Sequence, residues 1–229
     1  MSRLGDGQMV TMKCHGPLDG FRMPVDWSRH RHYLHGSWEP DVVNAMQQCV
    51  TRGDSAIDVG AHIGYHSLIL ARCVGTRGRV VALEPVEANR VLLEANLRLN
   101  NCEHVDVMGV AAGSSEGSVT LGTEERHRYP GTSAIGRSAT RVATVNTTTI
   151  DTIVDAMPRG VKFMKIDVEG AELAVLDGAC RTLRTHHPVL VIELHDPDAP
   201  DAVLRRLREF GYRVRWRTRT GPIAHVLAT

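Results

Sequence analysis

The feature that most constrains the fold is a short apolar segment that ends in a glycine turn and runs into a helical pattern. Residues 55–59 (SAIDV) read as a buried strand, 60–64 as a turn and 67–74 as a helix. The order repeats, since 79–83 (RVVAL) reads as a strand and 88–99 places its apolar side chains on one helical face. Two consecutive strand-helix units predict parallel strands joined by right-handed crossovers.

The rest of the chain continues this alternation. Strands are predicted at 104–110, 118–121, 161–166 and 189–194, helices at 149–157, 172–183 and 199–210, and a closing hairpin at 212–216 and 223–227. The fold class is therefore α/β, with a single Rossmann-like, doubly wound sheet that is mostly parallel and includes an antiparallel C-terminal hairpin strand. Ligands of such sheets bind at the carboxyl ends of the strands, near the switch point.

The 229 residues suit one large domain. Residues 1–38 have an irregular pattern and are interpreted as an N-terminal cap or lid segment, whereas 39–229 form the main domain. A helix is predicted to begin at Pro40. The polar, glycine-rich stretch 122–138 is predicted to be a mobile loop that covers a site.

Composition excludes several classes of protein. The net charge of +1 gives no general attraction to nucleic acid. Five widely spaced cysteines without a C-x-x-C pair suggest reduced thiols rather than a disulfide framework or a zinc site. Neither a signal peptide nor an apolar run of the ~20 residues that cross a bilayer is visible. We therefore expect a cytoplasmic protein with no membrane contact.

The glycine turn has the pattern D-x-G-x-x-x-G, from Asp58 to Gly64. A dinucleotide fingerprint would be G-x-G-x-x-G, so that a pyrophosphate could bind at the helix N-terminus, and its third close glycine is missing. A nucleoside without phosphates fits better. Glu84 ends the next strand, where an acidic side chain accepts the hydroxyls of a ribose; the alternatives are a purely structural turn and a favourable charge at a helix N-terminus.

Three motifs together resemble the FkbM family of methyltransferases. They are 58–66 (DVGAHIGYH), 81–85 (VALEP) and 165–172 (KIDVEGAE), within a similarity that extends from about Trp38 to His195. The resemblance implies the class I methyltransferase fold, S-adenosylmethionine as cofactor and transfer of a methyl group to a hydroxyl oxygen. The expected acceptor is a small molecule such as a sugar or a compound of natural product biosynthesis.

The cofactor-binding residues implied by the motifs lie between the first helix and the fourth core strand. They are Glu39, Asp58, Gly60, Ala61, His62, Gly64, Glu84, Pro85, Val110, Ala111 and Asp167. Glu39 is expected near the amino group of the cofactor, with helix capping as the alternative. His62 departs from the family, which usually carries Asn there, and an imidazole reproduces only part of the hydrogen bonding of an amide.

The predicted catalytic residues are Asp167, Glu193 and His195, at the ends of two core strands. Two arrangements stay open. Asp167 with Glu193 or Asp196 could hold Mg²⁺, which would lower the pKa of an acceptor hydroxyl. Alternatively, His195 could accept the hydroxyl proton directly.

Other polar residues are given structural roles. Lys165 is on the same side of its strand as Asp167 and is expected to pair with a carboxylate. Glu169 and Glu172 are interpreted as a solvated first helical turn. His30, His32 and His35 are assigned to a surface loop rather than a metal site.

Competing functions are N-methylation, a non-catalytic nucleoside-binding regulatory module and an NAD-linked oxidoreductase, which the glycine spacing disfavours. An RNA methyltransferase is disfavoured by the low net charge, although 205–219 is rich in Arg. The acceptor and the oligomeric state do not follow from the sequence.

Overall fold

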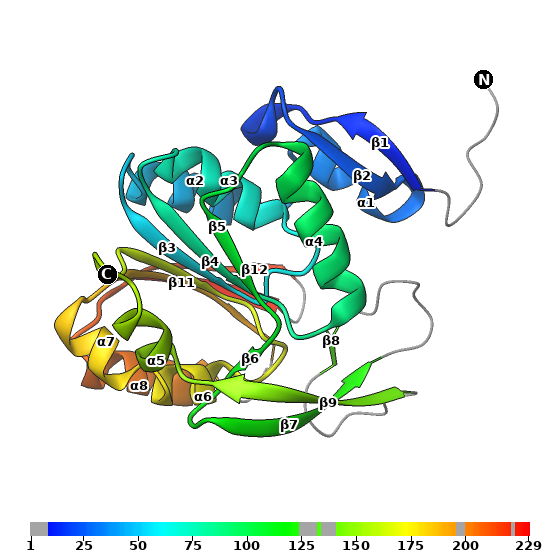
Figure 1. Ribbon diagram of the computed structural model, residues 1–229. Coiled ribbons are helices and arrows are strands. Elements are labelled where there is room, and N and C mark those ends of the chain that lie inside the picture. The colour runs from blue at the N-terminus through cyan, green and yellow to red at the C-terminus, as the bar shows by residue number, and fades with distance from the viewer. Residues whose placement is uncertain (1–8, 124–131, 134–140, 196–199, 221–222) are drawn as a thin grey trace.

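The computed structural model describes residues 9–123, 132–133, 141–195, 200–220 and 223–229. A central sheet of seven strands organises it, in the order β12-β13-β11-β10-β3-β4-β5 (Figure 1). The strands are β3 (Ser55–Val59), β4 (Arg79–Leu83), β5 (Val105–Met108), β10 (Phe163–Ile166), β11 (Val189–Leu194), β12 (Val214–Thr220) and β13 (Ile223–Ala228).

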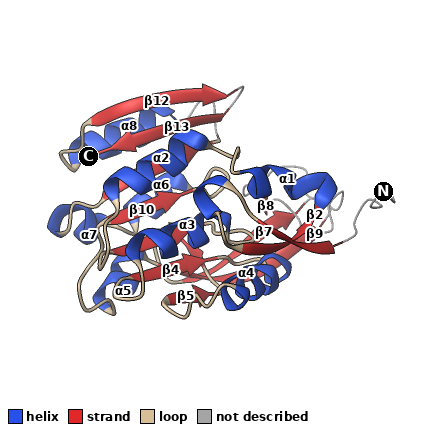
Figure 2. Cartoon of the chain, turned by 90° about the horizontal axis from the view of Figure 1, so that it is seen from above, coloured by secondary structure: helices blue, strands red, loops and turns tan. Residues whose placement is uncertain are grey.

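The predicted fold class is confirmed. Strands β5, β4, β3, β10 and β11 pair in parallel, whereas β13 runs antiparallel to both β11 and β12. The chain proceeds outward from β3 through β4 to β5, and outward from β10 through β11 to the hairpin, which occupies the opposite edge in Figure 2. The switch point therefore lies between β3 and β10, where a ligand site is expected.

Helices cover both faces of this sheet (Figure 1). One face carries α2 (Pro40–Cys49), α3 (Tyr65–Val74) and α4 (Glu87–Leu99), and the other carries α5 (Ile150–Asp155), α6 (Glu172–Asp177), α7 (Cys180–Thr185) and α8 (Pro200–Glu209). Successive strand side chains alternate between the two faces. Ala56 and Phe163 accordingly join the core under α2 and α3, whereas Ile57 and Met164 join the core on the other face.

The N-terminal segment is more regular than the sequence pattern predicted. It forms β1 (Met9–Lys13), a 3-10 turn (Gly16–Leu18), β2 (Arg22–Asp26) and α1 (Trp27–His35), with β1 and β2 antiparallel. Pro24 lies inside β2, and proline ordinarily argues against a strand. Leu18 and Leu34 are buried in the same core as α2 and α3, so this segment packs on the domain rather than forming a core of its own.

A second sheet of four strands, in the order β6-β9-β7-β8, was not predicted. Its strands are β6 (Ala111–Ala112), β7 (Gly117–Thr123), β8 (Thr132–Ser133) and β9 (Arg141–Thr148). The predicted loop 122–138 falls mostly outside the described residues. Strand β9 was not predicted because its described side chains are exposed or half-buried, so its sequence shows no alternation of buried apolar and exposed polar residues.

The helix predicted over 172–183 is interrupted, and this part of the prediction is wrong. Gly178 ends α6, and a Cβ there would collide with the carbonyl oxygen of Gly113. The carbonyl of Gly178 also accepts a hydrogen bond from the backbone N–H of Asp151, at 2.9 Å.

Within the described ranges, no helix combines the length and apolarity needed to cross a bilayer.

Candidate functional site

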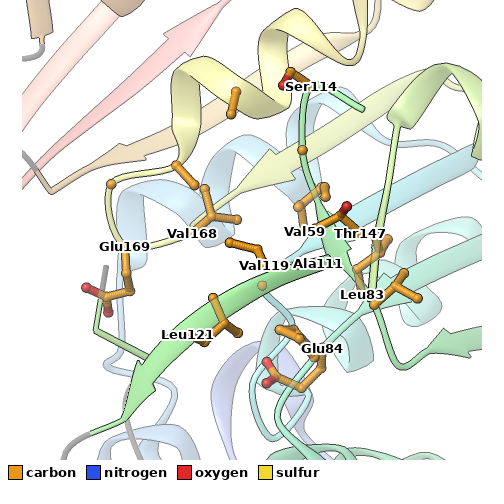
Figure 3. Close-up of a pocket in the computed structure, with 18 of the residues that line it drawn as sticks. Val59, Leu83, Glu84, Ala111, Ser114, Val119, Leu121, Thr147, Val168 and Glu169 are labelled. Carbon is orange, nitrogen blue, oxygen red and sulfur yellow. The ribbon is translucent and has the colours of Figure 1, made fainter. Parts of the chain in front are cut away.

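A cavity of about 300 Å³ opens at the carboxyl ends of β3, β4 and β10, at the switch point (Figure 3). Strand β7 of the second sheet passes across it and contributes Val119 and Leu121. The lining residues are Val59, Gly60, Leu83, Glu84, Pro85, Val110, Ala111, Ala112, Gly113, Ser114, Ser115, Ser118, Val119, Leu121, Thr147, Asp167, Val168, Glu169, Gly170, Ala171 and Ala174.

The glycine turn forms one wall of the cavity through Gly60. Its φ of 82° lies in the left-handed region, and a Cβ there would collide with the carbonyl oxygen of Asp167. The backbone N–H of Gly60 donates to the carbonyl of Leu83 at 3.0 Å, which ties the turn to β4. His62 also has a positive φ, of 50°. His, like Asn and Asp, adopts that region more often than most residues, so an imidazole at this position is compatible with the turn.

Glu84 is 2% exposed and holds the turn in place. Its Oε2 accepts the backbone N–H of His62 at 2.8 Å, and its Oε1 accepts the backbone N–H of Val86 at 2.9 Å. Burial raises the pKa of this carboxyl group, and the two N–H donors counteract part of that rise. The side chain reaches the cavity while fixing the loop that forms its wall.

Asp58, in contrast, does not line the cavity. Its side chain points to the face under α2 and α3, where Oδ2 accepts the hydroxyl of Ser67 at 2.6 Å. Oδ1 lies 3.6 Å from Nζ of Lys165. Ala61, His62 and Gly64 are likewise behind the wall; a Cβ on Gly64 would lie 2.5 Å from Leu93. These residues shape the turn from beneath, whereas Gly60, Glu84, Pro85, Val110, Ala111 and Asp167 face the cavity.

Asp167 ends β10 and its side chain is paired with Lys165. Nζ of Lys165 donates to Oδ2 of Asp167 at 2.9 Å, so the predicted ion pair is confirmed. Burial raises the pKa of Asp167, and the ammonium of Lys165 counteracts that rise. For Lys165, burial would lower the pKa, but the carboxylates of Asp167 and Asp58 raise it above its usual value.

His195 brings the predicted catalytic residues together. Its Nε2 lies 3.6 Å from Oδ1 of Asp167 and 3.3 Å from Oε1 of Glu193. Burial would lower the pKa of His195, but contacts with Glu172 and Glu193, aided by the charges of Glu169 and Asp167, raise it to about 11. An imidazole that keeps its proton at neutral pH is a poor general base. The geometry therefore disfavours that proposed role of His195.

Glu169 and Glu172 differ from their interpretation as a solvated helical turn. Glu172 is buried, accepts from Nδ1 of His195 at 3.0 Å and accepts the backbone N–H of Gly170, also at 3.0 Å. Glu169 precedes α6, has a φ of 52° and lines the cavity with its side chain 41% exposed. Burial raises the pKa of Glu169 to about 7, with His195 opposing the rise.

Glu39 neither caps α2 nor lines the cavity. Its backbone is left-handed, with a φ of 44°, and its side chain makes no hydrogen bond to the first turn of the helix. Oε2 of Glu39 lies instead 3.5 Å from Nε2 of His66. Burial, followed by the negative charge of Glu193, raises the pKa of Glu39 to about 7.

The cluster at Asp167 does not fit Mg²⁺. Asp167, Glu193 and His195 have candidate ligand atoms within 4.8 Å of one another. However, Oδ2 of Asp167 already accepts the ammonium of Lys165 at 2.9 Å, and the pKa of His195 leaves that imidazole charged. Two neighbouring cations oppose a third. Asp196, the other predicted ligand, lies outside the described residues.

Three solved structures of other proteins have a fold similar to that of this chain. The fold resembles an FkbM methyltransferase from Methylobacillus flagellatus, with a TM-score of 0.53 and 20% identity over 89% of this chain and 56% of that one. It also resembles an S-adenosylmethionine-dependent O-methyltransferase from Thermotoga maritima, with a TM-score of 0.54 and 18% identity over 84% of this chain and 65% of that one. A third similar structure is fibrillarin from Aeropyrum pernix, with natively bound S-adenosylmethionine, a TM-score of 0.54 and 12% identity over 83% of this chain and 74% of that one.

These likenesses show the fold of class I methyltransferases. No curated protein matches the sequence significantly. The profile of the methyltransferase FkbM domain, however, matches residues 58–214, which is more than half of the chain and includes both Glu84 and Asp167. The chain therefore belongs to the FkbM family of S-adenosylmethionine-dependent methyltransferases.

Proposed function

We propose that this methyltransferase transfers the methyl group of S-adenosylmethionine to a hydroxyl oxygen of a small-molecule acceptor, such as a sugar or a natural product. The observation that carries this proposal is the charge of the cavity. Glu84, Asp167 and Glu169 line it, and none of its described lining residues is Lys, Arg or His. An acidic wall repels the phosphates of NAD and favours a cationic sulfonium.

Five lining residues are assigned to cofactor binding. Glu84 would accept the ribose hydroxyls, as acidic residues do at this position of nucleoside-binding folds. Pro85, Val110 and Ala111 offer apolar surface for the adenine ring, and Gly60 allows the methionine part to approach the backbone. Asp58, Ala61, His62 and Gly64 act from behind by holding the turn. The expected contact of Glu39 with the amino group has no support in the cavity lining.

The chemistry then depends on removing one proton. When bound, S-adenosylmethionine supplies an electrophilic methyl group: the acceptor oxygen would bond to the methyl carbon as the carbon–sulfur bond breaks, and S-adenosylhomocysteine would leave. We assign Glu169 as the group that accepts the hydroxyl proton, because Glu169 lines the cavity and its pKa lies near 7, where a general base is most effective. Asp167 would face the reacting centre, and charged His195 with Glu193 would position both carboxylates.

Two alternatives make different demands on these residues. N-methylation of a neutral amine needs no base before the transfer, so it would survive the loss of Glu169. A non-catalytic nucleoside-binding module would need Glu84 but not Asp167, Glu193 or His195. The proposed reaction does not use Mg²⁺, because Lys165 already neutralises Asp167.

Calorimetric titration with S-adenosylhomocysteine and with NAD tests the cofactor assignment. We expect binding of the homocysteine nucleoside only, weakened about 10- to 100-fold in Glu84→Ala, which removes hydrogen bonds to a charged acceptor. Glu103→Ala is the matched control, since Glu103 is exposed and does not line this cavity. Preference for NAD, or no binding by a folded sample, would overturn the proposal.

Formation of S-adenosylhomocysteine with paired acceptors tests the reaction. Acceptors that differ only in carrying a hydroxyl or an amine should separate O- from N-methylation. We expect turnover of the hydroxyl partner and loss of that turnover in Asp167→Asn. Turnover of amines alone would refute the assigned nucleophile.

A further inference from the structure

A second cluster of titratable side chains lies next to the predicted catalytic residues. Glu39, which directly precedes α2, Glu193 of β11 and His225 of β13 have candidate ligand atoms within 4.8 Å of one another. Nε2 of His225 is 3.7 Å from Oε2 of Glu39 and 3.3 Å from Oε2 of Glu193. His66 of α3 faces the same carboxylate, with its Nε2 3.5 Å from Oε2 of Glu39.

Three of these polar atoms have ion-pair contacts of 3.3–3.7 Å but no hydrogen bond. Oε2 of Glu39, Nε2 of His66 and Nε2 of His225 are all buried without a hydrogen bond to any described residue. His66 and His225 are each only 7% exposed. A buried polar atom left unpaired costs about 1–3 kcal/mol, and such atoms often mark a bound water or ion. Their convergence on one point indicates a shared ligand.

The buried amine of Lys165 does not fill this role. Its ammonium donates to Asp167 at 2.9 Å and lies 3.6 Å from Asp58, and it acts on Glu39 and Glu193 only through its charge. Glu193 meets the charged imidazole of His195 through its other oxygen, Oε1, at 3.3 Å, so Oε2 of Glu193 and Oε2 of Glu39 are the carboxylate atoms that face His225. One divalent cation would cancel both negative charges and provide a partner for each orphaned atom.

We propose that Glu39, Glu193 and His225 bind a divalent transition metal ion, with zinc as the best match to the ligand set. Ligands bound to tetrahedral zinc at about 2.0–2.1 Å are ~3.3 Å apart, close to the observed separations of 3.3 and 3.7 Å. Imidazole with carboxylate suits zinc better than magnesium or calcium, which prefer oxygen ligands. A water on the fourth position of the metal would give His66 the hydrogen bond it lacks, and His66 would position Glu39.

Such a metal would join elements that are distant in the sequence. Glu39 directly precedes α2, Glu193 lies near the end of β11, and His225 lies on β13 near the C-terminus. The ion would attach the C-terminal strand to the first helix of the domain, and because Glu193 also contacts His195, it would fix the support of the predicted catalytic residues. We therefore expect the metal to stabilise the fold.

Metal analysis and zinc titration of the purified chain test this site. The protein is prepared with an affinity tag that contains no histidine, its metal content is measured, and chelator-treated protein is titrated with zinc chloride by calorimetry. We expect one equivalent of zinc per chain and a higher Tm after zinc addition. Affinity should fall at least about 100-fold in His225→Gln and in Glu39→Gln, since each removes a ligand. His187→Gln, at an exposed histidine stacked on Tyr212, is the control.

The outcomes separate a built site from adventitious binding. Zinc held at surface histidines would survive His225→Gln and Glu39→Gln unchanged, which would overturn the proposal. If either variant fails to fold, the wild-type protein still decides, because a folded wild type without a zinc-dependent rise in Tm also refutes the site. Titration of the same samples with S-adenosylhomocysteine is an independent readout, so loss of the metal site and failure of cofactor binding are distinguishable.

Discussion

Nζ of Lys165 lies 2.9 Å from Oδ2 of Asp167, and both side chains project from the same side of β10 as it ends. Lys165 is also the cation that faces the fully buried Asp58. Removing it leaves the buried carboxylate of Asp58 without a positive partner and leaves Asp167 with only the imidazole of His195, at 3.6 Å. Lys165→Met is therefore expected to lower the free energy of unfolding by about 3–5 kcal/mol, measured by urea titration. Lys162→Met is the control, since Lys162 is exposed three residues earlier. A loss below about 1 kcal/mol would show that the pair contributes little.

The close approach of Gly60 to the carbonyl oxygen of Asp167 predicts that Gly60→Ala destabilises the fold by more than the left-handed backbone angle alone would cause. Gly60 and Gly211 share a φ of 82°, but a Cβ on Gly60 meets the carbonyl of Asp167, whereas one on Gly211 meets nothing within 4 Å. Gly211→Ala should cost only about 1–2 kcal/mol of stability, the left-handed penalty. Gly60→Ala should cost clearly more and should weaken S-adenosylhomocysteine binding at least about tenfold. Equal losses in the two variants would contradict the clash.

The raised pKa of Glu169 predicts how activity depends on pH. Because burial places that pKa at about 7, the carboxylate is protonated below pH 7 and ionised above it. The value of kcat/KM should rise about tenfold per pH unit below pH 7 and level off above it. Glu169→Gln should be slow and should lose this inflection, while Glu103→Gln should retain it. An unchanged inflection in Glu169→Gln would assign the proton transfer to another group.

Asp151 stabilises the start of α7 from a separate helix. Its Oδ1 accepts the backbone N–H of Thr182 at 2.7 Å, and its Oδ2 accepts that of Arg181 at 3.0 Å. Burial would raise the pKa of Asp151, but these hydrogen bonds hold it below its usual value. Asp151→Ala should lower the free energy of unfolding at pH 7 by about 1–2 kcal/mol. Asp155→Ala, which removes an exposed ion pair with Arg181, should cost less than about 1 kcal/mol.

The sign of the pH effect at Asp151 is a second check. A lowered pKa means that the ionised form is favoured in the folded state, so its contribution is complete above the ordinary pKa of about 3.9 and fades as the pH falls through the folded-state value. The stability difference between wild type and Asp151→Ala should therefore stay constant from pH 7 to pH 5 and shrink below pH 4. A difference that persists at pH 2 would refute the electrostatic explanation.

The sequence predicted the parts of the molecule that local pattern determines. The run from Val189 to Leu194 is continuously apolar before Glu193, and it forms β11 with the predicted bounds. The alternation along β10 correctly placed Lys165 beside Asp167. Strand β9 and the hairpin of β1 with β2 lack such a pattern, because the described side chains of β9 are exposed or half-buried and β2 contains Pro24, a residue that argues against a strand.

The candidate site was predictable where a motif residue faces the cavity and unpredictable where a side chain turns behind it. Gly60 and Glu84 line the cavity as the pattern suggested, but Asp58 ends beneath it, because side-chain direction depends on which face of the sheet each residue meets. Glu172 was interpreted as part of a solvated helical turn. It is instead buried and accepts a hydrogen bond from His195, which lies 23 residues later in the sequence. No local signal contains that contact.

The chain segment that forms most of the second sheet is closed by a hydrogen bond between its two ends. The backbone N–H of Gly113 donates to the carbonyl of Thr148 at 2.9 Å, so the chain enters and leaves this sheet at adjacent points between β5 and α5. An excursion closed in this way can lengthen, shorten or change in sequence at little entropic cost and without displacing the parallel strands. Since Val119 and Leu121 of this excursion also line the cavity, we expect that exchanging 113–148 would change the acceptor preference while leaving the parallel strands in place.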